Sequence, residues 1–175
     1  MTAELLLIDV GNGRTKFGLA TRDAILAQRD TSTPSLSSDS LHHVLKDWNY
    51  THVICASVVP NATEALRAFV GDSLLVLGHD IELGIGINYP KPESIGADRL
   101  ANAAAVAALY GCPAVVVDFG TAVTFDVVSA PRCYIGGVIA PGLDAMTNYL
   151  YKRTALLPRL TRAEPGRAVG RSTRE

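Results

Sequence analysis

One pattern occurs twice in this sequence, and it constrains the fold more than any other feature does. Leu5–Ile8 and Ala114–Val117 are apolar runs, and an aspartate, Asp9 or Asp118, directly follows each run. The second aspartate lies 109 residues after the first. In both copies a glycine turn comes next and a second strand-like segment follows it, which predicts a β-hairpin. The repeat indicates two related units, each with an aspartate at the carboxyl end of a strand.

Strand-like and helix-like segments alternate along the rest of the chain. We expect helices over residues 36–48, 61–71, 97–110 and 143–152, and further strands over 53–58, 74–77 and 134–139. Asn61 and Glu64 have the spacing of a capping box and predict the start of the second helix. The alternation is typical of a mixed α/β fold. We place the boundary between the two units after residue 112, which gives the ranges 1–112 and 113–175.

Composition and charge argue against several classes of function. The 175 residues are 48% hydrophobic, which is enough for a globular core. The net charge of -1 gives no reason to expect binding to nucleic acid or to an anionic membrane. The three cysteines have no CxxC spacing, which argues against a disulfide framework or a zinc site. No stretch approaches the roughly 20 apolar residues of a membrane span. We therefore expect a cytoplasmic protein.

The two turns have the composition of a phosphate-binding site. Gly11 and Gly120 let backbone N–H groups approach an anion closely, because no Cβ is in the way. Asn12, Lys16 and Thr121 add donors, and each aspartate can hold a cation that bridges to phosphate. One such turn alone would be an ordinary hairpin, whereas two favour a nucleotide held between two lobes. Neither a Walker A nor a Rossmann motif is present.

A third acid stands at the start of the alanine-rich helix, where Asp98 and Arg99 follow Gly96 and Ala97. One interpretation is structural, with Asp98 as the helix cap and Arg99 in solvent. The other is catalytic, because phosphoryl transfer to a charged acceptor needs a carboxylate near the hydroxyl and a cation near the charge. Both interpretations fit these residues taken alone.

Five short motifs occur in a fixed order along the chain. They extend from Leu5 to Pro158, which is most of the chain. The motifs are Asp9-Val-Gly11-Asn12 followed by Lys16, Tyr89-x-x-Pro92-x-x-x-Gly96-Ala-Asp98-Arg99, Asp118-Phe-Gly-Thr121-Ala, Gly136-Gly-x-Ile-x-Pro141-Gly142 and Thr154-x-x-Leu157-Pro158. Each motif is weak by itself, but the ordered set is specific, and it closely resembles the type III pantothenate kinase family.

This resemblance implies a fold and an activity. The fold is that of the acetate and sugar kinase, heat-shock chaperone and actin superfamily, in which two ribonuclease H-like lobes with mixed sheets enclose a nucleotide cleft. The activity is transfer of the γ-phosphate of ATP to pantothenate, which gives 4'-phosphopantothenate in the first step of coenzyme A biosynthesis. The family also implies Mg²⁺ with ATP, a monovalent cation (K⁺ or NH₄⁺) and a homodimer.

The resemblance also implies a role for each matched residue. Asp98 would be the catalytic base. Asp9 would act through Mg²⁺, and Asp118 would bind the monovalent cation. Contacts to ATP phosphates would come from Gly11, Asn12, Lys16, Gly120 and Thr121. Contacts to pantothenate would come from Tyr89, Gly96, Arg99 and Thr154. Without the resemblance, Tyr89 would be interpreted as a packing residue and Thr154 as a helix cap.

The sequence departs from the family pattern in two respects. Gly13 stands where family members usually have Thr or Ser, so one phosphate donor is lost. The chain also has 175 residues where we expect roughly 250 for two complete lobes. We therefore expect the second lobe to be incomplete, in either a fragment or a shortened variant.

Two alternatives follow from these departures. The chain could be a non-catalytic relative that binds nucleotide or has a regulatory role. Against this, Asp9, Asp98, Arg99 and Asp118 are all retained. It could also be another kinase or phosphatase of the same superfamily. The acceptor-binding segment from Tyr89 to Arg99 argues against that, because many superfamily members share the phosphate hairpins but not this segment.

Overall fold

The chain forms two compact units in the computed structural model, which describes residues 1–160, 163–164 and 166–173. The first unit consists of Met1–Val116 and Asp126–Gly136, and the second of Val117–Phe125 and Gly137–Glu175. The division between the units runs through three strands, which are β7 (Ala114–Phe119), β8 (Ala122–Ser129) and β9 (Cys133–Pro141). The lobe boundary after residue 112 stays a prediction.

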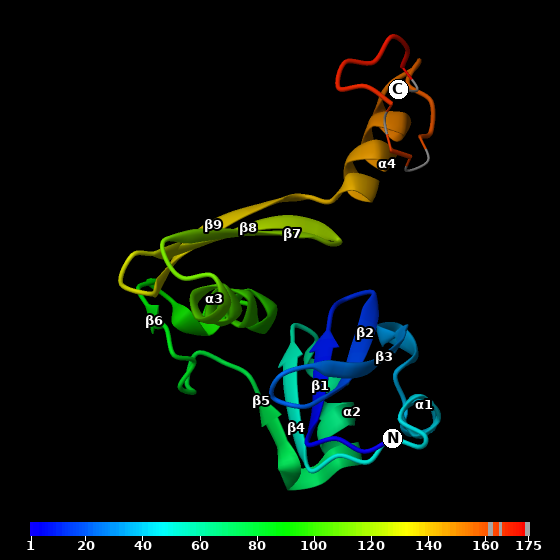
Figure 1. The fold of residues 1–175 in the computed structure, drawn as a ribbon. Coiled ribbons are helices and arrows are strands. Elements are labelled where there is room, and N and C mark those ends of the chain that lie inside the picture. Colours follow the sequence, from blue (N-terminus) through cyan, green and yellow to red (C-terminus); the bar gives the residue numbers. More distant parts are fainter. Residues whose placement is uncertain (161–162, 165, 174–175) are drawn as a thin grey trace. The chain divides into compact units, whose positions relative to one another are not determined.

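A five-stranded mixed sheet forms the centre of the first unit (Figure 1). β1 pairs with β2 in antiparallel and with β4 in parallel orientation, so the predicted first hairpin is confirmed. β3 adds to β2 in antiparallel and β5 to β4 in parallel orientation. In sheet order the strands are β3 (Ile25–Ser32), β2 (Arg14–Ala20), β1 (Leu5–Val10), β4 (His52–Ser57) and β5 (Leu74–Val76).

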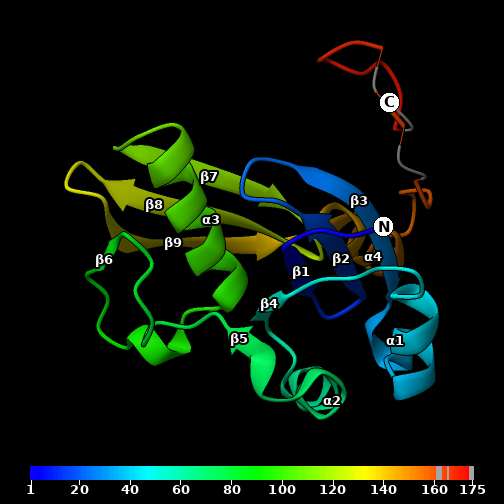
Figure 2. The same ribbon diagram turned by 60° about the horizontal axis from the view of Figure 1, so that its bottom comes forward.

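Two helices, α1 (Ser38–Val44) and α2 (Pro60–Val70), cover one face of this sheet (Figure 2). Alternate residues of a strand point to the same face. In β1 these are Leu6, Ile8 and Val10, which are buried in one apolar cluster with Leu41 of α1 and Leu66 of α2. The core of the first unit therefore lies between β1 and its two covering helices.

The start of α2 differs from the prediction. The helix begins at Pro60 and its N-cap is Val59, which makes no side-chain capping bond. Asn61 and Glu64 lie inside the helix, so the predicted capping box is wrong. Proline has a fixed φ and lacks the N–H that the first turn leaves unpaired, and it therefore favours the first helical position.

The second sheet has the order β6-β9-β8-β7, and β6 pairs with β9 in parallel orientation. Its strands are β6 (Gly86–Ile87), β7 (Ala114–Phe119), β8 (Ala122–Ser129) and β9 (Cys133–Pro141). The predicted second hairpin, β7–β8, is confirmed. The two sheets with their helices confirm the α/β fold class.

Helix α3 (Ala97–Leu109) packs on the part of the second sheet that belongs to the first unit. Its small residues Ala103 and Ala107 are buried against Val128 of β8 and Tyr134 of β9. Because their side chains are short, the helix lies close to the strands, as the alanine-rich sequence predicts.

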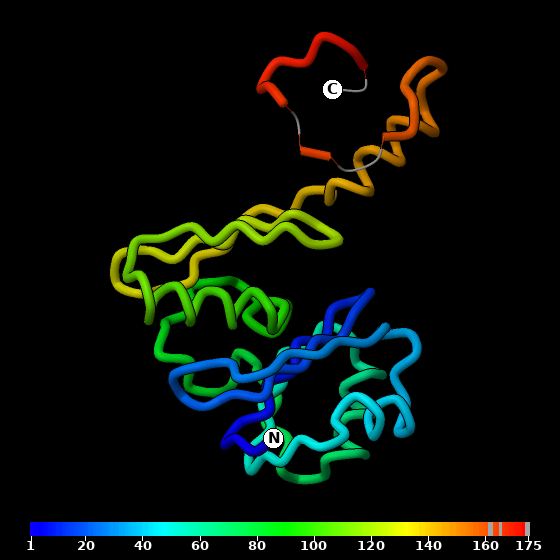
Figure 3. The backbone as a smooth tube through the Cα atoms, turned by 45° about the vertical axis from the view of Figure 1, so that its right-hand side comes forward, coloured from blue at the N-terminus to red at the C-terminus, as the bar shows by residue number. Residues whose placement is uncertain are grey.

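Helix α4 (Leu143–Arg153) follows β9, and Figure 3 traces this path from the yellow strand into the orange helix. None of the helices in the described residues combines the length and the apolar character that a membrane-spanning segment requires.

Candidate active site

The first aspartate-bearing turn joins β1 to β2 through Gly11, Asn12 and Gly13. Asp9 lies opposite Lys16 in the strand register, and Lys16 Nζ donates to Asp9 Oδ2 over 3.1 Å. The Asp9 side chain is 48% exposed, so this carboxylate is accessible from solvent. The N–H of Gly11 donates to the carbonyl of Arg14 over 3.1 Å and closes the turn. The structure thus brings three predicted residues, Asp9, Gly11 and Lys16, into one hairpin.

Hydrogen bonds from two buried threonines, Thr15 and Thr33, stabilise this turn. Thr15 Oγ1 and Thr33 Oγ1 are 2.9 Å apart, and Thr33 Oγ1 donates to the carbonyl of Gly11 over 2.7 Å. The Thr33 N–H donates to the carbonyl of Gly13 over 3.1 Å. Both threonines are buried. The two turn carbonyls are thereby occupied, which fixes the backbone conformation of the turn. Sequence reasoning missed Thr33.

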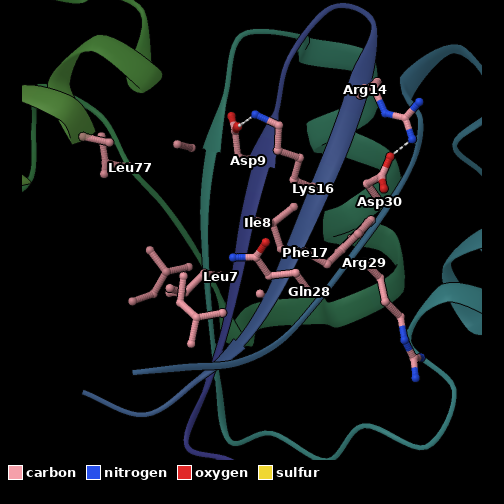
Figure 4. A pocket seen from close by; sticks show the side chains of 15 residues that line it. Leu7, Ile8, Asp9, Arg14, Lys16, Phe17, Gln28, Arg29, Asp30 and Leu77 are labelled. Atoms are coloured by element: carbon pink, nitrogen blue, oxygen red, sulfur yellow. Dashed lines mark hydrogen bonds and ion pairs between the residues drawn. The ribbon is translucent and has the colours of Figure 1, made fainter. Parts of the chain in front are cut away.

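A cavity of about 660 Å³ lies on the first sheet, and Asp9 and Lys16 are among its lining residues. Its other walls are largely apolar and include Leu7 and Leu77, as well as Ala101 of α3. Figure 4 shows the Asp9–Lys16 ion pair and the separate Arg14–Asp30 ion pair at this cavity. The cavity therefore connects the first aspartate turn with helix α3.

The start of α3 lies at the same end of the sheet as Asp9. The Val58 N–H donates to the carbonyl of Val10 at the end of β1 over 3.1 Å. A Cβ on Gly96 would lie 3.4 Å from Val58 Cγ1. Val58 thus links the carboxyl end of β1, with Asp9, to the segment that carries Asp98.

Gly96 and Asp98 are packed directly against each other. Asp98 Oδ1 accepts a hydrogen bond of 2.8 Å from the N–H of Arg99. A Cβ on Gly96 would lie only 2.5 Å from this oxygen, a contact that no side chain tolerates without movement. Gly96 is the N-cap residue of α3 and makes no side-chain capping bond. Asp98 is therefore not the N-cap residue, but its carboxylate accepts a first-turn N–H and lies where it interacts favourably with the helix dipole, as the structural interpretation expected.

Arg99 is not solvated either. Its Nε donates to Asp126 Oδ1 over 2.6 Å, and its side chain is only 14% exposed. Tyr134 Oη donates to the same carboxylate oxygen over 3.1 Å. Burial and the adjacent Asp126 carboxylate raise the pKa of Tyr134 to about 12, against the lowering effect of Arg99, so its hydroxyl remains a donor at neutral pH.

Sequence reasoning missed Asp126 and Tyr134. Asp126 is completely buried, in the otherwise largely apolar strand β8. A charged residue in such a strand is a recognisable signal, because a buried charge requires a partner. The identity of the partner could not be obtained in this way, since Arg99 lies 27 residues earlier in the chain.

Tyr89 lies beside this cluster. Its ring centroid is 6.2 Å from that of Tyr134, and a Cβ on Gly136 would approach Tyr89 Cε2 to 3.4 Å. Gly136 has a φ of 119°, a conformation that few residues other than glycine adopt. The side chain of Tyr89 remains accessible at 36% exposure. The first unit therefore gathers Tyr89, Gly96, Asp98 and Arg99 around the start of α3.

The second aspartate turn belongs to the second unit. Gly120 and Thr121 join β7 to β8, and the Gly120 N–H donates to the carbonyl of Ala122 over 2.9 Å. This turn has one residue fewer than the first, so the two repeats differ in their turns. The Gly142 N–H donates to the carbonyl of Thr121 over 3.2 Å. Asp118 is exposed.

Thr154, in the same unit, is the C-cap residue of α4. Its Oγ1 donates to the carbonyl of Leu150 over 2.9 Å and accepts from the Leu157 N–H at 3.3 Å. The capping interpretation of this threonine is confirmed. A role in binding pantothenate stays a prediction.

Two solved structures with a similar fold are proteins of Campylobacter jejuni and Aquifex aeolicus. A Campylobacter jejuni protein described as a conserved putative Baf family transcriptional activator has a TM-score of 0.56 at 22% identity, over 93% of this chain and 68% of that one. A Ppx/GppA phosphatase from Aquifex aeolicus has a TM-score of 0.50 at 15% identity, over 85% of this chain and 56% of that one. Similarity at this level of identity establishes the fold alone, and both structures share it over most of this chain.

Sequence comparison identifies the family. The chain is 50% identical over 171 residues to the type III pantothenate kinase of Akkermansia muciniphila, which covers 97% of this chain and 71% of that protein. It is 41% identical to the enzyme of the same name from Methylacidiphilum infernorum, over 98% of this chain and 63% of that protein. The family model described as type III pantothenate kinase matches residues 5–175. The chain belongs to the type III pantothenate kinase family.

Proposed function

We propose that this protein transfers the γ-phosphate of ATP to the hydroxyl of pantothenate, and so forms 4'-phosphopantothenate for coenzyme A biosynthesis. Membership of the family supports the reaction. The observation in the structure that carries the proposal is the start of α3, where Asp98 and Arg99 lie together at the end of the sheet that carries Asp9. This transfer needs a base near the hydroxyl, a positively charged side chain that binds the acceptor, and a carboxylate beside the phosphates. Asp98, Arg99 and Asp9 would fill these roles in that order.

In this proposal Asp98 accepts the proton of the attacking hydroxyl as the phosphoryl group is transferred. Arg99 and Tyr89 hold the pantothenate, and the close contact at Gly96 keeps the Asp98 carboxylate in place. Thr154 would complete the pantothenate site. Because the Asp98 carboxylate is held by the backbone N–H of Arg99, the base and the binding residue are oriented by the same helical turn.

The proposed phosphate contacts are divided between the two turns. Gly11, Asn12 and Lys16 would contact phosphate from the first turn, and Gly120 and Thr121 from the second. Mg²⁺ in kinases is held by one or two carboxylates together with the nucleotide phosphates. Asp9 fits this requirement because its carboxylate is half-exposed at a strand end. When bound, Mg²⁺ would neutralise charge on the phosphates.

Release of ADP from purified protein tests the reaction. We expect release with ATP, Mg²⁺ and K⁺ to depend on pantothenate, because the acceptor hydroxyl is the nucleophile. The control is the same mixture without pantothenate, which measures hydrolysis by water. If soluble, folded protein released ADP at the same rate in both mixtures, the proposed function would be wrong.

The monovalent cation is tested separately. We propose that Asp118 binds K⁺ or NH₄⁺ beside the second turn, where its side chain is exposed. Activity of the wild type should then rise when Na⁺ is replaced by K⁺, and Asp118→Ala should lose this response. A variant that kept the full response to K⁺ would show that the cation binds elsewhere.

We further propose that residues 1–112 and 113–175 correspond to the two lobes of the family, and that the protein acts as a homodimer in the cytoplasm. Exposed apolar side chains on β7 support an association of this kind. They are Val115, Val117 and Phe119.

A further inference from the structure

The ion pair between Arg99 and Asp126 is only half satisfied. Arg99 Nε and Tyr134 Oη both donate to a single oxygen, Asp126 Oδ1. Asp126 Oδ2 and Arg99 Nη2 are both buried, and neither has a hydrogen-bond partner among the residues that the structure describes. Buried charged groups are normally fully hydrogen-bonded, and exceptions of this kind call for an explanation.

The arrangement of the donors suggests that explanation. A guanidinium group has five N–H donors in a rigid plane and can bind two carboxylates along different edges. Asp126 Oδ1 binds at Nε, and one N–H of Nη2 shares that edge of the guanidinium. The other N–H of Nη2 points away from Asp126 and is left for a second acceptor, which reaches it once the side chains that bury Nη2 move aside. The Tyr134 ring lies under the guanidinium, with Arg99 Cζ 5.9 Å from the ring centroid. The hydrogen bond to Asp126 and the contact of the guanidinium face with the Tyr134 ring therefore restrict the Arg99 side chain to one orientation.

We infer that Asp126 is a positioning residue for the acceptor. Through Nε it fixes the Arg99 guanidinium so that Nη2 donates to the carboxylate of the bound substrate. This inference rests on the proposed function, in which Arg99 holds pantothenate. It adds a residue that touches neither substrate nor ATP but sets the preference for an acceptor with a negative charge.

Two opposing effects decide what Asp126→Asn should do. Removing a negative charge beside Arg99 increases the attraction for an anionic substrate, which would tighten binding. It also leaves a largely buried cation without a charged partner, and such a cation turns toward water. We expect the second effect to prevail, because the Arg99 side chain, already 14% exposed, has a route to solvent.

The test compares pantothenate with pantothenol, in which a hydroxymethyl group replaces the carboxylate. Isothermal titration gives the Kd of each ligand, and steady-state kinetics gives KM for pantothenate and for ATP. We expect Asp126→Asn to weaken pantothenate about tenfold, as loss of one charge-assisted hydrogen bond does, while the Kd of pantothenol and the KM for ATP stay within about twofold. Tyr134→Phe, which keeps the ring and the charge, should give a smaller loss in the same direction.

The matched control is Glu4→Gln, which removes the carboxylate of another arginine pair, Arg22 with Glu4 at 3.6 Å. It should leave all of these constants unchanged. An equal loss of affinity for both ligands in Asp126→Asn would mean that the residue only supports the fold. Unchanged or tighter binding of pantothenate would overturn the positioning role as well. If Asp126→Asn did not fold, the Tyr134→Phe titration would decide by the same comparison.

Failure of this inference is distinguishable from failure of the proposed function. A wild type that phosphorylates pantothenate, together with an Asp126→Asn variant of unchanged affinity, would overturn only the inference. A wild type that binds pantothenate without phosphorylating it would overturn the proposed reaction, while the two Kd values would still decide on Asp126. A wild type that neither binds nor phosphorylates pantothenate would overturn both.

Discussion

Asp98→Asn is expected to lower kcat by a factor of at least ~100, the usual range for the loss of a general base. The amide cannot accept the proton of the attacking hydroxyl at neutral pH. It has nearly the same size as the carboxylate, and its oxygen can still accept the hydrogen bond from the Arg99 N–H. The close contact with Gly96 is therefore retained, and the local structure should survive the substitution. The measurement is pantothenate-dependent ADP release at saturating substrates.

The control for Asp98→Asn is Asp39→Asn. Both aspartates lie in the first turn of a helix, Asp98 in α3 and Asp39 in α1. Each substitution removes a favourable interaction with the helix dipole, worth about 0.3–1 kcal/mol. A loss of activity caused by helix destabilisation would thus appear in both variants, together with a lowered Tm. Near-normal kcat in folded Asp98→Asn would refute the assignment of Asp98 as the base.

Local patterns predicted much of this fold. Both hairpins were predicted from apolar runs that end in an aspartate and a glycine turn, because the strand period and the turn residues are encoded within about fifteen positions. Helix α3 was predicted for the same reason, since alanine has the highest intrinsic helix propensity and a run rich in alanine favours a helix by its local sequence.

Other elements depend on contacts that the sequence does not display. β3 was not predicted. It is an edge strand whose inward residues are only partly buried, and its contrast between apolar and polar positions is therefore weak. The start of α2 was placed wrongly because a capping-box pattern was given more weight than Pro60.

The residues of the candidate site also fall into two groups, those that local sequence reveals and those that only tertiary contacts reveal. Motif residues such as Asp9 and Asp98 could be found because each belongs to a continuous stretch with a recognisable chemistry. Thr33 has no such signal, and Asp126 stands out in its apolar strand without showing its partner, because each acts on a residue more than twenty positions away, Gly11 and Arg99 respectively. Residues that hold a site in shape are connected to it by tertiary contacts, and only coordinates identify them.

Gly142→Ala is expected to disrupt the second aspartate turn. The backbone at Gly142 has φ −68° and ψ 166°, which alanine adopts without strain, so any effect must come from the added methyl group. That Cβ would lie 2.4 Å from the carbonyl oxygen of Thr121 and 2.6 Å from that of Gly120. Both contacts are with backbone atoms, so a change of side-chain rotamer cannot relieve them.

The turn must therefore move away from Gly142, and the hydrogen bond from the Gly142 N–H to Thr121 is lost with it. Overpacking of this kind costs about 1–3 kcal/mol. If Gly120 and Thr121 bind phosphate as proposed, KM for ATP should rise at least ~10-fold, because displaced N–H groups no longer converge on the anion. KM for pantothenate should change less, since Arg99 and Tyr89 belong to the first unit. Steady-state kinetics and thermal denaturation measure the two effects.

Gly166→Ala is the matched control in the second unit, because a Cβ at Gly166 would meet no atom of the described residues within 4 Å. It should behave like the wild type in both measurements. If Gly142→Ala lowered Tm but left KM for ATP unchanged, the turn would be a structural element that does not contact the nucleotide. The phosphate-binding role would then fall to the first turn, where Thr33 and Thr15 hold the backbone of Gly11 in place.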